Sequence, residues 1–165
     1  MKNKKYSLLV LLAVLMLMVY GCKTNNGYNN EPISGDKTKP GIITNIKVDN
    51  FNGGAYITYD LPNSENILYV LAKYSIRNGV NRETKSSYYT DTVTVNGFAN
   101  EADYDVTLYT VTRANVMSDP VSVTVHPATP VYKLVSPSVA IAPDFGGVNI
   151  QAKNPLKKEI GIFSW

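Results

Sequence analysis

Apolar and polar residues alternate with a period of two along most of the chain after Pro40. Successive side chains of a β-strand point to opposite faces, so each alternating run has one face for a core and one for solvent. A seventh strand, with a less regular pattern, is expected between Arg82 and Tyr89. The apolar positions of the six clearest runs are Ile46 and Val48; Ala55, Ile57 and Tyr59; Leu68, Val70, Ala72, Tyr74 and Ile76; Val93 and Val95; Tyr104, Val106 and Leu108; and Val121, Val123 and Val125.

The spacing of these runs indicates the fold class. They recur about every ten residues, separated by Gly, Pro, Asn and Asp, which is typical of an all-β sandwich and not of βαβ units. Residues 37–127 hold all seven runs and are enough for one sandwich domain with its own core. After the N-terminal apolar segment, no stretch shows a convincing helical period.

A phrase of the sequence occurs twice, as FNGGAYI around Gly53-Gly54 and as DFGGVNI around Gly146-Gly147. At this offset of 93 residues the flanking alternation is also kept: Val48 corresponds to Ile141, and Ile57 to Ile150. A glycine pair supplies the positive φ of a tight reversal, a structural role that needs no ligand. Residues 131–165 are therefore expected to begin a second β-sandwich with the same hairpin. The alternative is two unrelated sandwich openings that share a turn.

Residues 131–165 are too few to close a second sandwich, whose edge strands would stay unpaired. We therefore expect this second domain to be incomplete in the chain. A fragment, an interrupted gene and a domain completed by a partner remain open explanations.

The N-terminus has the layout of a secretory signal. Lys2, Lys4 and Lys5 precede an apolar run, residues 6–20, that is short for a membrane span. The ending Val19-Tyr20-Gly21-Cys22 resembles a bacterial lipobox, which implies cleavage after residue 21 and a lipid anchor on Cys22. A free thiol on Cys22 is the alternative. Residues 22–36 are mostly polar and are expected to form a flexible tether.

Removing the signal changes the charge. The chain has 16 Lys and Arg against 13 Asp and Glu, and the three signal lysines account for the whole excess. A neutral exported part has no basic cluster to release counterions from a phosphate backbone, so nucleic acid is not an expected partner. Cys22 is the only cysteine, so no disulfide framework is available.

Candidate catalytic and metal-binding residues are few. His126, the only histidine, lies on the polar phase of the last run beside Pro127, where an exposed or hinge role is favoured over catalysis. Asp103 and Asp105 share a strand face, which favours a solvated edge over a calcium site. Nucleophilic catalysis needs a nucleophile with a base in reach, and no such pair is identified. We expect no enzyme activity, no cofactor and no metal.

Three phrases resemble fibronectin type III domains: GAYITYDLP from Gly54, VNGF from Val95 and YDVTL from Tyr104. The resemblance implies that Tyr104 forms a tyrosine corner, in which the hydroxyl binds backbone a few residues upstream. The tryptophan common on the second strand of such domains is absent, and Tyr59 stands in its place.

Exposed tyrosines are the candidate binding residues. Tyr56 and Tyr109 lie on outward phases and Tyr88 lies in the less regular seventh run, where their rings could stack on glycan faces. The alternatives are cross-strand aromatic pairing on a sheet surface and contact with the second domain.

Longer phrases, among them RETKSSYYTDTVTVNGF and APDFGGVNI, resemble a family of Bacteroidota cell-envelope lipoproteins. That resemblance implies a fibronectin type III-like domain, a second β-sandwich and a C-terminal discoidin-like module, found with outer-membrane glycan-uptake systems. It implies a non-catalytic accessory or scaffold role. The alternative is a protein–protein interaction module that docks a transporter or partner lipoprotein without touching carbohydrate. Lys23 and the three residues after it are not acidic, so periplasmic and surface display both stay open.

Overall fold

A computed structural model describes residues 33–63 and 66–161. The expected signal peptide, the lipid anchor on Cys22 and the tether up to residue 32 lie outside the described residues. Within them, no helix is long and apolar enough to cross a membrane.

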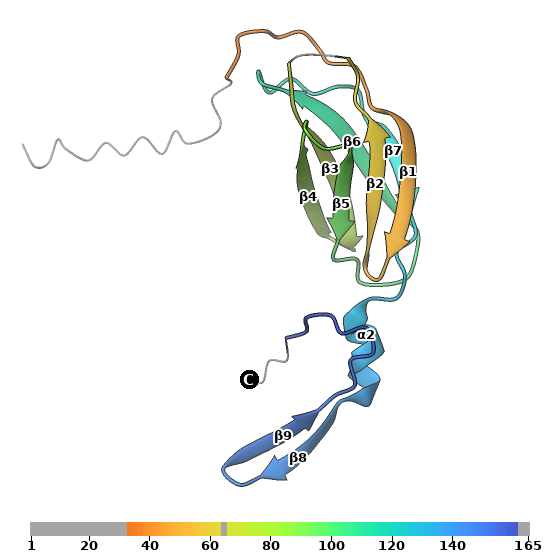
Figure 1. Cartoon of the computed structure of the whole chain (residues 1–165), viewed down its shortest axis with the longest axis vertical. Coiled ribbons are helices and arrows are strands. Elements are labelled where there is room, and N and C mark those ends of the chain that lie inside the picture. The colour runs from red at the N-terminus through yellow and green to blue at the C-terminus, as the bar shows by residue number, and fades with distance from the viewer. Residues whose placement is uncertain (1–32, 64–65, 162–165) are drawn as a thin grey trace, which may run out of the picture. The chain divides into compact units, whose positions relative to one another are not determined.

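Seven antiparallel strands form two sheets (Figure 1). One sheet has the order β1-β2-β5 and the other β4-β3-β6-β7. This is the predicted fibronectin type III-like β-sandwich, and all seven predicted runs are strands. Their bounds are β1 Thr44–Phe51, β2 Gly54–Asp60, β3 Ile67–Arg77, β4 Val80–Ser87, β5 Thr92–Asn96, β6 Tyr104–Thr112 and β7 Val121–Val125.

The core lies between the two sheets and follows the predicted alternation. On β2, Ala55, Ile57 and Tyr59 are buried, while Tyr56 and Asp60 are exposed. Burying a side chain such as isoleucine stabilises a fold by about 1.5–3 kcal/mol, so this alternation supplies the main driving force. Tyr59 is the largest of the fully buried side chains.

Two stretches depart from the alternation. Leu71 is buried although it lies on the outer phase of β3, and Thr110, Val111 and Thr112 are buried in succession at the end of β6. Burying a hydroxyl is costly unless it is hydrogen-bonded. Thr110 Oγ1 donates to the carbonyl of Gly41 at 2.6 Å, and Thr112 Oγ1 accepts from the backbone of the following loop. Polar residues are thus buried here because loop backbone covers them.

The segment before β1 contacts the sandwich from Ile33 onward, which is closer to the N-terminus than the domain start expected at residue 37. The backbone N–H groups of Ile33 and Ser34 donate to the carbonyl of Arg113 at 2.8 and 3.3 Å. Lys39 forms an ion pair with Asp119 at 2.5 Å. Residues 33–36, assigned to the tether by composition, therefore run against the loop that follows β6.

Residues 131–161 differ in part from the expected second sandwich. They begin with a helical turn, α2 (Val131–Val135), and a 3-10 turn, η1 (Ser136–Ser138), that the sequence pattern did not predict. Five residues are too few to show a 3.6-residue period, and Pro130 stands at the N-cap of α2, directly before its first helical residue. The hairpin expected at Gly146-Gly147 is present as β8 (Ala140–Asp144) and β9 (Gly147–Gln151).

The β8–β9 hairpin has an apolar face with nothing packed on it among the described residues. Ile141 pairs with Ile150, and Pro143 with Val148, so these four side chains share one face. Every residue of both strands is exposed. The expected hairpin is thus formed, whereas no core is packed on it within residues 33–63 and 66–161.

Candidate functional site

The three candidate tyrosines lie in different places. Tyr56 is on β2 of the three-stranded sheet and Tyr109 is on β6 of the four-stranded sheet, while Tyr88 follows β4 in a turn. The ring of Tyr56 lies 4.7 Å from that of Phe51 on the neighbouring strand, which is the cross-strand aromatic pairing given as its structural alternative. No single surface therefore joins all three.

Tyr88 is joined instead by Tyr89, a residue that the sequence analysis did not single out. Their ring centroids are 4.0 Å apart, and 81% of Tyr89 is exposed. Thr90 N–H donates to the Ser87 carbonyl at 3.0 Å, so the two tyrosines are the central residues of a four-residue turn. Two adjacent aromatics between strands, where Gly, Asn, Asp and Pro are the usual turn residues, are the sequence signal for this site.

Side-chain hydroxyls hold this turn. Ser86 Oγ donates to the Thr92 carbonyl at 2.6 Å and lies 2.7 Å from Thr90 Oγ1. Thr90 Oγ1 donates to the Ser87 carbonyl at 3.0 Å, and the N–H of Tyr88 donates to the Leu68 carbonyl at 3.3 Å. The turn is therefore bound to both β5 and β3.

A shallow pocket of about 510 Å³ lies beside the turn. We call it the turn pocket; it is lined by Tyr59, Asp60, Leu61, Tyr88, Tyr89, Thr90 and Asp91. Asp60 accepts a hydrogen bond from Asn45 Nδ2 at 2.6 Å, and Asp91 accepts one from Thr92 Oγ1 at 2.9 Å. Each carboxylate is thereby held in place and keeps further acceptor positions.

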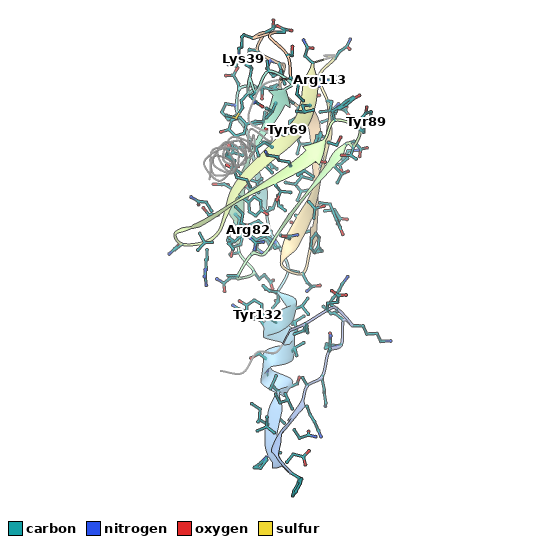
Figure 2. All side chains as sticks on the ribbon, turned by 90° about the vertical axis from the view of Figure 1, so that its left-hand side faces the viewer. Lys39, Tyr69, Arg82, Tyr89, Arg113 and Tyr132 are labelled. Atoms are coloured by element: carbon teal, nitrogen blue, oxygen red, sulfur yellow. The ribbon has the colours of Figure 1, made fainter. Side chains whose placement is uncertain are left out.

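Two tyrosines of the turn pocket have shifted acidities. Burial raises the pKa of Tyr59, and the nearby Ser86 hydroxyl acts in the opposite direction. The Tyr59 hydroxyl is buried and makes no hydrogen bond of good geometry among the described residues. The Tyr89 phenol raises the pKa of Tyr88, and the guanidinium of Arg113 acts in the opposite direction. Figure 2 shows Tyr89 and Arg113 near the same end of the sandwich. The Tyr88 phenol is thus held in its neutral form, with the Arg113 cation beside it.

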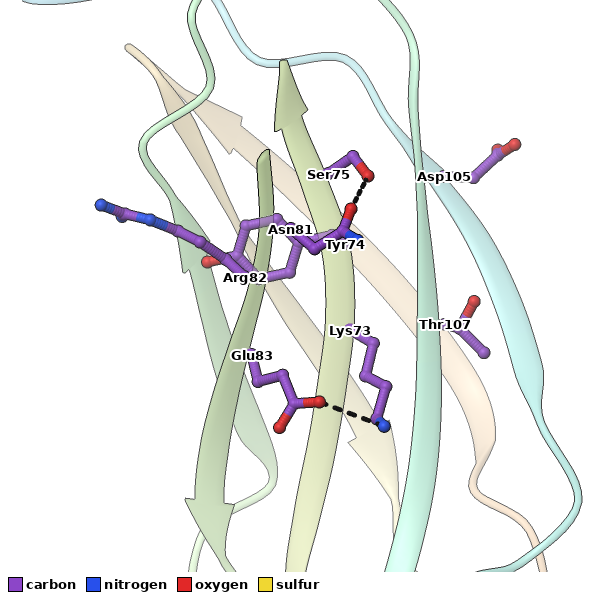
Figure 3. A pocket seen from close by; sticks show the side chains of 8 residues that line it. All are labelled: Lys73, Tyr74, Ser75, Asn81, Arg82, Glu83, Asp105 and Thr107. Atoms are coloured by element: carbon purple, nitrogen blue, oxygen red, sulfur yellow. Dashed lines mark hydrogen bonds and ion pairs between the residues drawn. The ribbon is translucent and has the colours of Figure 1, made fainter. Parts of the chain in front are cut away.

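A second hollow, of about 400 Å³, lies over β3, β4 and β6 and is lined mainly by polar side chains (Figure 3). Lys73 Nζ lies 3.1 Å from Glu83 Oε1, and Ser75 donates to Asn81. These cross-strand partners satisfy one another. Its polar groups thus have a structural role in the sheet surface.

Tyr104 lies at the start of β6 and its hydroxyl reaches back four residues. It donates to the Asn100 carbonyl and accepts from the Asn100 N–H, both at 3.2 Å. Its ring centroid is 4.4 Å from that of Phe98. This is the geometry of a tyrosine corner, and it holds the loop between β5 and β6.

The segment that follows β7, residues 128–133, is hydrogen-bonded to the β1–β2 turn (residues 51–53) and to the loop between β5 and β6 (residues 99–101). We call this contact the joint. Gly53 N–H donates to the Ala128 carbonyl at 2.9 Å, and Ala128 N–H donates to the Phe51 carbonyl at 3.1 Å. Asn52 Nδ2 donates to the Thr129 carbonyl at 2.8 Å. Tyr132 donates its hydroxyl hydrogen to the Ala99 carbonyl at 2.7 Å, and Lys133 donates to Asn100.

The titratable residues considered for chemistry form small, exposed pairs. His126 Nδ1 lies 2.7 Å from Asp103 Oδ1, with both side chains more than half exposed. Asp105 accepts from Thr124 Oγ1 at 3.0 Å. Among residues 33–63 and 66–161, no group of three or more His, Cys, Asp or Glu side chains is placed to hold a metal ion.

Comparisons with solved structures return β-sandwiches at low identity. A chain described as "Myokine structure" is 14% identical over 55% of this chain and 100% of its own, with a TM-score of 0.45. Domains d3-d4 of the rat CD45 extracellular region are 14% identical, covering 55% of this chain and 51% of theirs, also with a TM-score of 0.45. A beta-1,2-glucanase from Parabacteroides distasonis is 13% identical, covering 61% of this chain and 14% of the enzyme, with a TM-score of 0.43. At these values no activity is transferred.

Sequence comparison is more specific. No curated protein sequence matches the chain. The family profile described as "Domain of unknown function (DUF4959)" matches residues 40–127, which is the seven-stranded sandwich together with the segment just before it. The chain therefore belongs to the DUF4959 family.

Proposed function

We propose that the protein is a non-catalytic lipoprotein of the bacterial outer membrane, anchored through Cys22, whose sandwich is a scaffold in a glycan-binding and uptake system. The observation that carries the scaffold role is the joint, in which hydrogen bonds tie the sandwich to the segment that follows it. The anchor and the glycan system rest on the lipobox and on the resemblance to Bacteroidota envelope lipoproteins.

The joint has more hydrogen bonds than a simple link between two parts of a chain requires. A spacer that only links two parts can be flexible and polar and needs no bonds to either. Here two loops of the sandwich, the β1–β2 turn and the loop of the tyrosine corner, both bind residues 128–133. Each such hydrogen bond contributes about 0.5–1.5 kcal/mol, and the set therefore restrains α2 against the sandwich.

The joint can be tested by combining Asn52→Ala with Tyr132→Phe, which removes two of its side-chain hydrogen bonds. In the unaltered protein we expect amide order parameters in Val131–Val135 near the value of about 0.85 seen for rigid backbone. In the double variant they fall toward 0.6. Tyr109→Phe, outside the joint, is the control and leaves them unchanged. Order parameters below 0.6 in the unaltered protein would contradict the scaffold role.

The anchor is tested separately. In a bacterial host fed labelled palmitate, the protein should incorporate label and fractionate with the outer membrane. Cys22→Ala should abolish both, since the acyl chains are attached to this thiol. Label that persists in Cys22→Ala, or a protein of unchanged size found only in the inner membrane, would argue against this location.

A second candidate function is docking to a transporter or partner lipoprotein, and the apolar face of the β8–β9 hairpin favours it. Ile141 is 67% exposed and Val148 61% exposed on that face. A photo-crosslinker at Val148 in the native envelope would then form an adduct with one membrane protein, and a crosslinker at Lys47 would not. Equal adducts from both positions would show that the face is not a docking surface.

A further inference from the structure

We propose that the turn pocket is a binding site for a neutral carbohydrate chain, with Tyr89 as its stacking platform. This goes beyond the scaffold role because it places direct carbohydrate contact on the sandwich itself. The two roles use different ends of the sandwich: β4 starts at Val80, near the joint, and ends at Ser87, where the tyrosine turn begins.

The first observation is the exposure of Tyr89. Among the large apolar side chains of residues 33–63 and 66–161, only Phe145 has a larger exposed fraction than Tyr89. Exposing an aromatic ring to water forgoes the free energy of burying 150–250 Å² of surface. A four-residue turn can be built from small polar residues without that cost. The fold therefore has no need of Tyr89 at this position.

The second observation is that the turn is organised in advance. The Ser86, Ser87 and Thr90 side chains bind one another or the local backbone, and the Tyr88 ring lies against the Tyr89 ring with centroids 4.0 Å apart. A ring held in its binding orientation loses little conformational entropy when a ligand stacks on it. Such preparation is expected of a binding residue and serves no purpose for a ring in solvent.

The chemistry beside the rings selects the ligand. A pyranose has one apolar C–H face, which suits an aromatic ring, and a rim of hydroxyl donors, which suits carboxylates such as Asp60 and Asp91. Those two carboxylates repel anionic ligands, including nucleotides. Arg113, beside Tyr88, offsets the attraction for a cationic peptide. A neutral, hydroxyl-rich ligand fits this balance of charges.

The size of the pocket also favours a small ligand. Its volume of about 510 Å³ lies within the range of about 300–1,000 Å³ that is usual for small-molecule sites. A stable protein interface buries about 800 Å² on each partner, far more than this turn offers. The shallow, open form suits a segment of a chain better than an enclosed monosaccharide.

The test is affinity electrophoresis of the full chain through gels containing soluble dextran, mannan, xylan or arabinogalactan. We expect at least one polysaccharide to retard the protein. Tyr89→Ala should lower that affinity at least tenfold, while Tyr89→Phe keeps most of it because the ring remains. Tyr56→Ala, which removes another exposed tyrosine, is the matched control and should leave retardation unchanged.

Melting curves of all variants accompany the gels, and Tyr89→Ala should melt with the unaltered protein because its side chain supports no core. Equal retardation of Tyr89→Ala and the unaltered protein would overturn the proposal. So would a lack of retardation by all four polysaccharides, or tighter binding to a lysine-rich peptide. None of these results changes the order parameters of the joint, so this site and the scaffold role can fail independently.

Discussion

The two glycine-pair hairpins, β1–β2 and β8–β9, reverse the chain in the same way. Phe51 pairs with Gly54 and Asp144 with Gly147, so each has a two-residue loop. The second loop residue has a positive φ in both, 73° at Gly53 and 78° at Gly146. Their surroundings differ completely: Ile57 is fully buried, whereas Ile150, its counterpart 93 residues later, is 38% exposed.

The difference separates what local sequence decides from what packing decides. The glycine pair and the alternation are enough to form the turn and the register of a hairpin. Burial needs a second sheet, and β1–β2 obtains one from β4-β3-β6-β7. A lone two-stranded hairpin is marginally stable in water, so β8–β9 depends on what covers its apolar face.

The largest expected effect is at the corresponding isoleucines. Ile57→Ala removes a fully buried side chain and leaves a cavity, so we expect the free energy of unfolding of the sandwich to fall by about 2–5 kcal/mol. Ile150→Ala, the matched control, removes a partly exposed side chain outside the sandwich and should cost less than about 0.5 kcal/mol. Urea denaturation of both variants measures the difference. Comparable losses would mean that the second hairpin is packed against the sandwich.

A smaller effect is expected at the second glycine of each pair. A Cβ at Gly54 would lie 2.6 Å from the Val95 carbonyl oxygen and 2.4 Å from the Phe51 ring, whereas a Cβ at Gly147 would meet nothing within 4 Å. Gly54→Ala should therefore cost about 1–3 kcal/mol through overpacking, and Gly147→Ala should be close to neutral. Thermal melts of the two variants provide the measurement. A neutral Gly54→Ala would show that the strands separate more easily than the structure indicates.

The smallest effect is at Tyr59, whose counterpart 93 residues later is the exposed Ala152, just after β9. Its hydroxyl is buried and makes no hydrogen bond of good geometry, so Tyr59→Phe should change stability by no more than about 1 kcal/mol at pH 7.

Tyr59 also predicts a pH dependence. Burial raises its folded-state pKa above the unfolded value of 10.0, so its neutral form is favoured in the fold. The free energy of unfolding that comes from keeping the Tyr59 hydroxyl neutral is fully present below pH 10. It is lost as the pH rises through the higher folded-state pKa. Denaturation at pH 8 and pH 11 should show a smaller alkaline loss for Tyr59→Phe. An identical decrease in stability in both proteins would mean that other tyrosines cause the alkaline destabilisation.

Much of the fold follows from sequence because alternation reports which side of a strand is apolar. The seven strands, the inward positions such as Ile57 and Val95, and the β8–β9 hairpin are all readable in this way. Thr110 and α2 are not, because the burial of Thr110 depends on the loop backbone at Gly41 and because α2 is too short to show a helical period. The burial of Leu71 on the outer phase of β3 also departs from the alternation.

The candidate site was predicted less completely. Tyr88 was identified, and Tyr89 and Asp91 belong to the same turn, but Asp60 reaches the turn pocket from the end of β2, an approach that depends on strand pairing within the sandwich. The joint could not be predicted, since its bonds mostly join backbone carbonyls such as those of Ala99 and Ala128 to distant groups. Backbone acceptors are present at every residue and therefore leave no mark in the amino-acid pattern.

Amide hydrogen exchange, resolved by residue in the full chain, tests most directly whether one hairpin is part of a folded core and the other is not. The account predicts that the amides of Ile57 and Val93 exchange only through global unfolding, while those of Ala142 and Asn149 exchange through local opening at least a hundredfold faster. Equal protection of β2 and β9 would contradict it, because β8–β9 would then be as firmly packed as β1–β2.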